Sequence, residues 1–111
     1  MEIQFATNKL KKIFNNEHEL VRAYGSISQK IKLRMNVLRN APNLAFVPIT
    51  PPDRCHELKA DRAGQFAVDL VHPHRLVFKP SEHPPPTKEG GGVDKGNVVS
   101  ITIIEVVNYH D

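Results

Sequence analysis

Six residues whose side chains could bind or cleave a phosphodiester lie in or next to predicted strands: His56, Lys59, Arg62, Arg75, Tyr109 and His110. His56 begins a short predicted strand, Arg75 opens another, and the Tyr109-His110 pair follows the last one. If the last strand lies beside the middle of the sheet, one end of the sheet gathers two imidazoles, a phenol and several fixed cations.

Such a set suits the cleavage of an RNA phosphodiester without a metal ion. The attacking 2′-hydroxyl must lose a proton, the leaving 5′-oxygen must gain one, and negative charge accumulates on the phosphoryl oxygens. Histidine can serve as base or acid close to neutral pH, and arginine and lysine stabilise the charge on phosphate. A tyrosine can stack on a base or donate a hydrogen bond. The sequence leaves open which histidine is the acid and which is the base.

The other histidines and the single cysteine form weaker patterns. His72-x-His74 could contribute to a metal site with His83 or Cys55, but turn histidines are more often solvent-exposed and no carboxylate cluster supports a catalytic metal. Cys55 stands alone, so it builds neither a disulfide nor a multi-cysteine metal site. Early in a strand, it is predicted to be a small buried hydrophobe rather than a nucleophile. We expect no metal and no cofactor.

Length and composition predict one small domain. The chain has 111 residues, of which 40% are hydrophobic and 24% charged, and this supplies one modest core. Its most apolar run, 98–107, is interrupted by Ser100, Thr102 and Glu105, and it is far short of the ~20 apolar residues of a membrane-spanning helix. The first residues have neither the basic start nor the apolar stretch of a signal peptide. We therefore expect a cytoplasmic protein that does not bind a membrane.

Positive charge is concentrated in the N-terminal part. Residues 1–40 carry eight Lys and Arg against three Asp and Glu, whereas residues 41–111 carry seven against nine. A basic half favours a polyanion or an acidic partner protein and speeds encounter with either. A solvated helix face rich in lysine accounts for the charge equally well.

Apolar spacing predicts helices first and strands afterwards. A strand over 3–5 precedes a helix capped by Thr7 or Asn8, a second helix after 15–16, and a longer one that Ser26 or Ser28 caps. Prolines make the connection to the sheet stiff and extended. The connection spans residues 42–53, and strands are expected over 55–59, 66–70, 75–79 and 98–107. The last strand has apolar side chains on both alternations, so it is expected to be buried on both faces. The expected fold is α+β, with basic helices packed on a small, mostly antiparallel sheet in a single domain over residues 1–111.

Residues 80–97 contain three consecutive prolines and three consecutive glycines. Prolines lack the backbone donor and glycines carry a high ordering entropy, so this segment is expected to be a mobile hairpin loop that does not pair as a strand. A lid or a partner-contact segment is the functional alternative.

Three stretches carry a family resemblance: RCHELKADRAGQFAVDL over 54–70, HRLVF over 74–78 and VVNYH over 106–110. Their Arg-x-His-x-Leu-Lys motif, with Asp and Gly-Gln-Phe behind it, resembles that of the HigB-like killer toxins of the RelE/ParE superfamily. The resemblance covers the chain in order: short strand, basic helices, proline connection, then sheet. It implies a compact α+β toxin of a type II toxin-antitoxin system, which enters the ribosomal A site and cuts messenger RNA there. It also implies a cognate antitoxin, usually a helix-turn-helix protein, so that operator DNA is bound only through the complex.

The same resemblance implies roles for individual residues. The family's strand histidine falls on His56 and its terminal Tyr-His pair on Tyr109 and His110; its phosphate-contacting cations fall on Lys59 and Arg75, with Arg62 as a further phosphate binder. The two histidines would be acid/base or orienting groups, and the tyrosine would stack on a base or donate a hydrogen bond. Where the family commonly ends in Asp-Tyr-His, this chain has Asn108. Its amide can hydrogen-bond but cannot act as the carboxylate would.

Two other functions fit the same resemblance. One is a non-enzymatic inhibitor of DNA gyrase, as in the ParE-like branch, which needs a docking surface but no converging His and Tyr side chains. The other is a catalytically weak relative, marked by Asn108 and the altered loop, that is kept for binding the antitoxin or operator.

Overall fold

In the computed structural model, which describes residues 1–108, the N-terminal part of the chain forms the predicted strand and helices. They are β1 (Glu2–Phe5), α1 (Asn8–Phe14), α2 (Glu17–Tyr24) and α3 (Ser28–Asn40). The Thr7 hydroxyl accepts a hydrogen bond from the backbone N–H of Leu10, which confirms the predicted cap of α1. The predicted serine cap of α3 is wrong. A 3₁₀ turn over Gly25–Ile27 runs directly into α3, and within the described chain no side chain caps its first turn.

The C-terminal part supplies the rest of one five-stranded sheet. Its strands are β2 (His56–Glu57), β3 (Phe66–Asp69), β4 (His74–Pro80) and β5 (Ser100–Asn108). The order across the sheet is β1-β5-β4-β3-β2, with β1 parallel to β5 and the other pairs antiparallel. The α+β fold with a mostly antiparallel sheet is therefore confirmed.

Two details of the connection to the sheet differ from the expectation. A 3₁₀ turn over Leu44–Phe46 interrupts the extended segment, because the Asn43 side chain accepts from the backbone N–H of Ala45 and closes a local turn. The strand expected over 55–59 is only two residues long. The backbone turns into the left-handed region at Arg54 (φ 46°) and again at Ala60 (φ 58°), which limits strand pairing at both ends.

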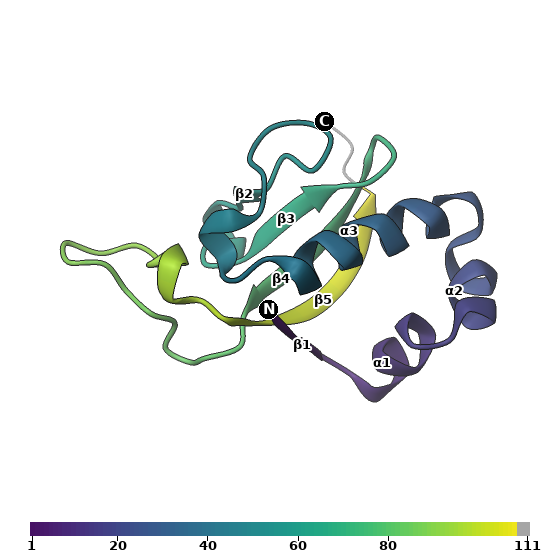
Figure 1. Ribbon diagram of the computed structural model, residues 1–111, viewed down its shortest axis with the longest axis horizontal. Coiled ribbons are helices and arrows are strands. Elements are labelled where there is room, and N and C mark those ends of the chain that lie inside the picture. Colours follow the sequence, from purple (N-terminus) through teal and green to yellow (C-terminus); the bar gives the residue numbers. More distant parts are fainter. Residues whose placement is uncertain (109–111) are drawn as a thin grey trace.

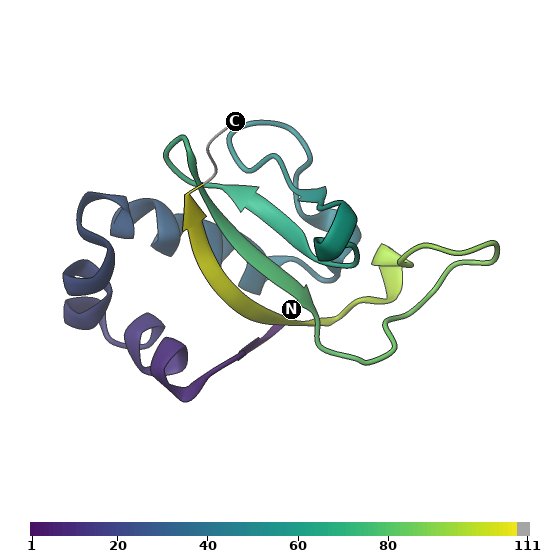
Figure 2. The same ribbon diagram turned by 180° about the vertical axis from the view of Figure 1, so that it is seen from behind.

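Helix α3 crosses one face of the sheet (Figure 1). In the view from behind no described α-helix crosses the other face, which we call the helix-free face (Figure 2). The core lies between α3 and the covered face, and its most deeply buried members include Ile31, Leu38, Phe66, Phe78, Ile101 and Ile103. The expectation that the last strand is covered on both faces is wrong, because Ile101 and Ile103 are buried whereas Thr102 between them is only partly buried. Within residues 1–108, every helix is too short or too polar to cross a bilayer.

The proline- and glycine-rich segment projects from the end of the sheet opposite α1 and α2 (Figures 1 and 2). It forms a hairpin, as expected, but it does make one strand-like pair, an antiparallel bridge between Thr87 and Val93. The backbone N–H of Lys88 donates to the carbonyl of Gly92. The turn of the hairpin contains Gly90, Gly91 and Gly92, which all have positive φ. Glycine tolerates this conformation without a Cβ clash. The mobility of this loop stays a prediction.

Candidate active site

Strand alternation sorts core side chains and site side chains onto opposite faces of the sheet. Phe66 belongs to the core, so Ala67 faces the other way and Asp69 faces with it. His56 pairs with Ala67, and Arg75 pairs with Asp69. Directly opposed residues of antiparallel strands share a face. The strand register thus brings His56, Asp69 and Arg75 onto the helix-free face.

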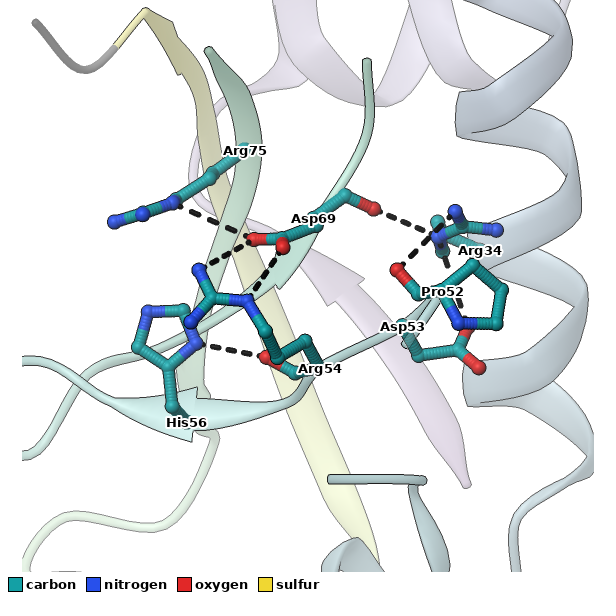
Figure 3. A network of polar contacts seen from close by, with 7 residues as sticks. All are labelled: Arg34, Pro52, Asp53, Arg54, His56, Asp69 and Arg75. Carbon is teal, nitrogen blue, oxygen red and sulfur yellow. Dashed lines mark hydrogen bonds and ion pairs between the residues drawn. The ribbon is translucent and has the colours of Figure 1, made fainter. Parts of the chain in front are cut away.

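Asp69 holds two arginines at this end of the sheet (Figure 3). Its carboxylate accepts hydrogen bonds from Arg54 Nε at 2.7 Å and Arg54 Nη2 at 3.3 Å, and Arg75 Nε lies 3.4 Å from the same group. The hydrogen bond to Asp69, aided by Coulomb attraction, raises the pKa of the Arg54 guanidinium above its ordinary value. Two cations therefore face one carboxylate. We call Arg54, Asp69 and Arg75 the arginine cluster.

The His56 ring is oriented by the backbone of the arginine cluster. Its Nδ1 atom lies 2.8 Å from the carbonyl oxygen of Arg54. A carbonyl only accepts hydrogen bonds, so Nδ1 is the donor. In the neutral ring the proton is then on Nδ1, and Nε2 carries the lone pair that can take a proton. His56 is thus held in the tautomer of a general base.

The backbone at Arg54 is strained. Its φ of 46° lies in the left-handed region, which costs a non-glycine residue roughly 1–2 kcal/mol. Two backbone hydrogen bonds hold it there, from Arg54 N to Thr50 O and from Cys55 N to Pro48 O, both at 2.9 Å. Conformations of this kind cluster at functional sites. The strained turn points the Arg54 carbonyl at His56 while its side chain reaches Asp69.

A buried arginine anchors the arginine cluster to the helix layer. Arg34 of α3 is 5% exposed, and its Nε donates to the backbone carbonyl of Asp69 at 2.7 Å. Its Nη2 donates to the carbonyl of Pro52 at 3.4 Å, and its Nε lies 3.6 Å from Asp53 Oδ1. One side chain therefore ties α3 to the end of β3 and to the segment that carries Arg54 (Figure 3).

The other predicted phosphate contacts lie beyond β2. Lys59 is exposed in the segment after β2. Arg62 donates to Glu105 Oε1 at 2.7 Å and to Gln65 Oε1 at 2.9 Å. Because Glu105 belongs to β5, the Arg62 side chain crosses the helix-free face. Its phosphate-binding role stays a prediction, and binding would compete with the Glu105 ion pair.

Tyr109 and His110 lie outside the described residues. The last described residue, Asn108, is exposed and pairs with His74, next to Arg75 on β4. His56 is three strands away from β5, about 14 Å at ordinary strand spacing.

Of the residues at this end of the sheet, His56 and Arg75 were predicted from the sequence, whereas Arg34, Arg54 and Asp69 were not. A weak signal was present, because Asp69 alternates with apolar residues in its strand and so faces away from the core. A signal was also present for Arg34, which lies three residues after Ile31 and four before Leu38 and so falls on the apolar side of α3.

Cys55 is buried, as predicted, and desolvation raises the pKa of its thiol to about 11. At pH 8 its thiolate fraction is then about 100-fold or more below that of an ordinary cysteine of pKa ~8.5. We expect a chromogenic disulfide reagent to label the native protein at least about 100-fold more slowly than the urea-unfolded protein. Equal labelling rates in the two states would contradict this burial.

The structure does not assemble the possible metal site. Among residues 1–108, no three His, Cys, Asp or Glu side chains are placed to hold one metal ion. His72 and His74 line a cleft beside the arginine cluster, whereas His83 lines a separate hollow on the loop after β4.

Comparison with solved structures shows the fold over nearly the whole chain. A "YoeB/ParE toxin from Agrobacterium tumefaciens" is 17% identical and superposes with a TM-score of 0.54, covering 99% of this chain and 100% of its own. The "YoeB-YefM complex from Staphylococcus aureus" contains a chain that is 14% identical, with a TM-score of 0.54, covering 100% of this chain and 98% of its own. No protein-family model and no curated protein matches the sequence. The chain has the fold of these YoeB/ParE toxins.

Proposed function

We propose that this protein is the toxin of a type II toxin-antitoxin pair and acts as a metal-independent endoribonuclease on messenger RNA in the ribosome. The observation that carries the proposal is the orientation of His56. Its Nδ1 is fixed by the Arg54 carbonyl, and its ring shares a face with the arginine cluster. The toxin fold and the resemblance of the sequence to HigB-like toxins support the same function.

In the proposed reaction, His56 Nε2 takes the proton of a 2′-hydroxyl, whose oxygen attacks the adjacent phosphorus. Arg75 and Arg54 stabilise the charge on the phosphoryl oxygens. The bond from phosphorus to the 5′-oxygen breaks, and His110 gives that oxygen a proton. The products are a 2′,3′-cyclic phosphate and a 5′-hydroxyl. Tyr109 stacks on a base, and Lys59 and Arg62 contact phosphates of the same strand.

The proposed partners follow from the charge and the fold. The basic helices would contact ribosomal RNA, because dense phosphate rewards Lys and Arg. We expect a cognate antitoxin to bind and inhibit the free toxin. The Staphylococcus aureus neighbour was solved as a YoeB-YefM complex. We expect a helix-turn-helix antitoxin, with operator DNA bound only through the complex. The proposed site of action is the cytoplasm.

Induction in a bacterial host, with primer extension on a translated reporter messenger, tests the function. Wild-type protein is expected to arrest growth and to cut within the reading frame, and the cuts should vanish when the start codon is removed. His110→Ala is expected to abolish both effects while antitoxin binding persists. Equal arrest and equal cutting by wild type and His110→Ala would remove the C-terminal tail from the site.

The two alternative functions predict different results in the same experiment. Growth arrest without cuts, together with loss of supercoiling by purified gyrase, would favour the gyrase inhibitor. No arrest at all, with antitoxin binding retained, would favour the catalytically weak relative that Asn108 suggests.

A further inference from the structure

A cleft of about 390 Å³ lies between α3 and the turn that joins β3 to β4. Four cations and one carboxylate are among its lining residues: Lys30, Arg34, Arg54, Arg75 and Asp69. This volume falls within the usual range of ligand pockets, roughly 300–1,000 Å³. It suits a ligand of about the size of one nucleotide.

Among the described residues that line the cleft, the cations Lys30, Arg34, Arg54 and Arg75 outnumber the single carboxylate, Asp69. Arg34 is compensated by Asp53, and the Asp69 carboxylate is shared between Arg54 and Arg75. Lys30 lies one turn before Arg34 on α3 and is exposed. An excess of cations in a concave site attracts anions, and arginine and lysine together suit phosphate oxygens.

One of the residues that line the cleft, His74, has a buried ring nitrogen. His74 Nδ1 is buried and has no hydrogen-bond partner among the described residues. Buried polar atoms are nearly always paired in folded proteins.

The cleft is continuous with the candidate active site, because the arginine cluster belongs to both. Arg54, Asp69 and Arg75 line the cleft, and the same residues share the helix-free face with His56. A nucleic acid strand whose reacting phosphate lies at His56 and Arg75 can therefore place a neighbouring phosphate in the cleft without leaving the surface.

We propose that this cleft binds the phosphodiester next to the one that is cut, with Lys30 as the contact that distinguishes it from the reacting site. The inference rests on the proposed function, since that function supplies the RNA strand. It adds Lys30 of α3 as a phosphate contact beside the arginine cluster, which lines both the cleft and the reacting site.

Binding of a 2′-O-methyl RNA trinucleotide, which cannot be cut, tests the subsite by NMR titration of the full chain. Amide signals of Lys30 and of residues 72–74 are expected to shift. Lys30→Gln should weaken binding about threefold to tenfold and lower the slope of log affinity against log salt by about 0.7. The matched control is Lys9→Gln on α1, which should change the affinity less than about twofold.

Two further measurements distinguish a phosphate within an RNA strand from free inorganic phosphate. Replacing one charged linkage of the trinucleotide by an uncharged methylphosphonate should lower its affinity for the wild type to the affinity of Lys30→Gln for the charged trinucleotide. Lys30→Gln should bind the methylphosphonate form with no further loss of affinity, because both changes remove the same contact. Inorganic phosphate alone should shift the same amides only at much higher concentration. Equal affinities for inorganic phosphate and the trinucleotide would overturn the assignment to an RNA strand.

The subsite and the proposed function fail separately. Unchanged affinity and salt slope in Lys30→Gln, or no shifts at millimolar trinucleotide, would overturn the subsite even if messenger is cut in cells. Absence of cutting in cells would overturn the proposed function even if the trinucleotide binds at Lys30.

Discussion

Replacing His56 by alanine is expected to lower the rate of messenger cleavage by about 10²- to 10⁴-fold, the usual contribution of a positioned general base. The imidazole is held by the hydrogen bond from Nδ1 to the Arg54 carbonyl at 2.8 Å, so Nε2 is ready to accept a proton in the neutral ring. Alanine removes that acceptor and leaves the arginine cluster in place, because the cluster is held by Asp69 and not by His56. Single-turnover cleavage of messenger on programmed ribosomes measures the effect.

The matched control for this prediction is His83→Ala. His83 is an exposed histidine of the loop after β4, and its loss is expected to change the rate less than about twofold. Both variants should keep the wild-type circular dichroism spectrum and bind the antitoxin equally well. A rate for His56→Ala within about threefold of wild type would show that the base is another group.

Replacing Arg34 by alanine is expected to destabilise the fold by about 3–5 kcal/mol, the usual cost of removing one partner from a buried ion pair. The variant leaves Asp53, which is 7% exposed, without its guanidinium. It also removes the donors to the backbone carbonyls of Asp69 and Pro52. For a domain of this size the loss corresponds to a fall in Tm of about 10–20 °C, which thermal unfolding followed by circular dichroism measures.

Arg39→Ala is the matched control on the same helix. Arg39 is exposed, so its replacement is expected to change stability by less than about 0.5 kcal/mol. The double variant Arg34→Met with Asp53→Leu should recover part of the loss, because it removes the unpaired buried charge as well. Equal stabilities of Arg34→Ala and Arg39→Ala would show that the buried network contributes little.

The elements of the fold could be predicted because their signals are local. A helix face repeats every three or four residues and a strand face every second residue, and both periods are present in order along the chain. The Thr7 cap was predictable because its partner is only three residues away. The start of α3 could not be predicted in the same way. The 3₁₀ turn over Gly25–Ile27 leads directly into the helix, so no serine side chain caps its first turn among the described residues.

The site could be predicted only where its residues lie at the start of a strand: His56 is the first residue of β2 and Arg75 the second of β4. The contacts that orient them join residues far apart in the chain. Arg34 and Asp69 are separated by 35 positions, and Arg62 and Glu105 by 43. No periodicity reports such a separation. The ion pair between Arg62 and Glu105 could therefore not be predicted, and the phosphate-binding role of Arg62 stays a prediction.

The sequence by itself determined the α+β class, the order of the elements and the alternation that places core and polar side chains on opposite faces, since each depends on spacing within one segment. Only the tertiary structure decided which strands are neighbours and therefore which charges meet. Strand order and register are set by packing the whole apolar surface against α3, and that choice placed Asp69 between two arginines and fixed the His56 ring on the Arg54 carbonyl.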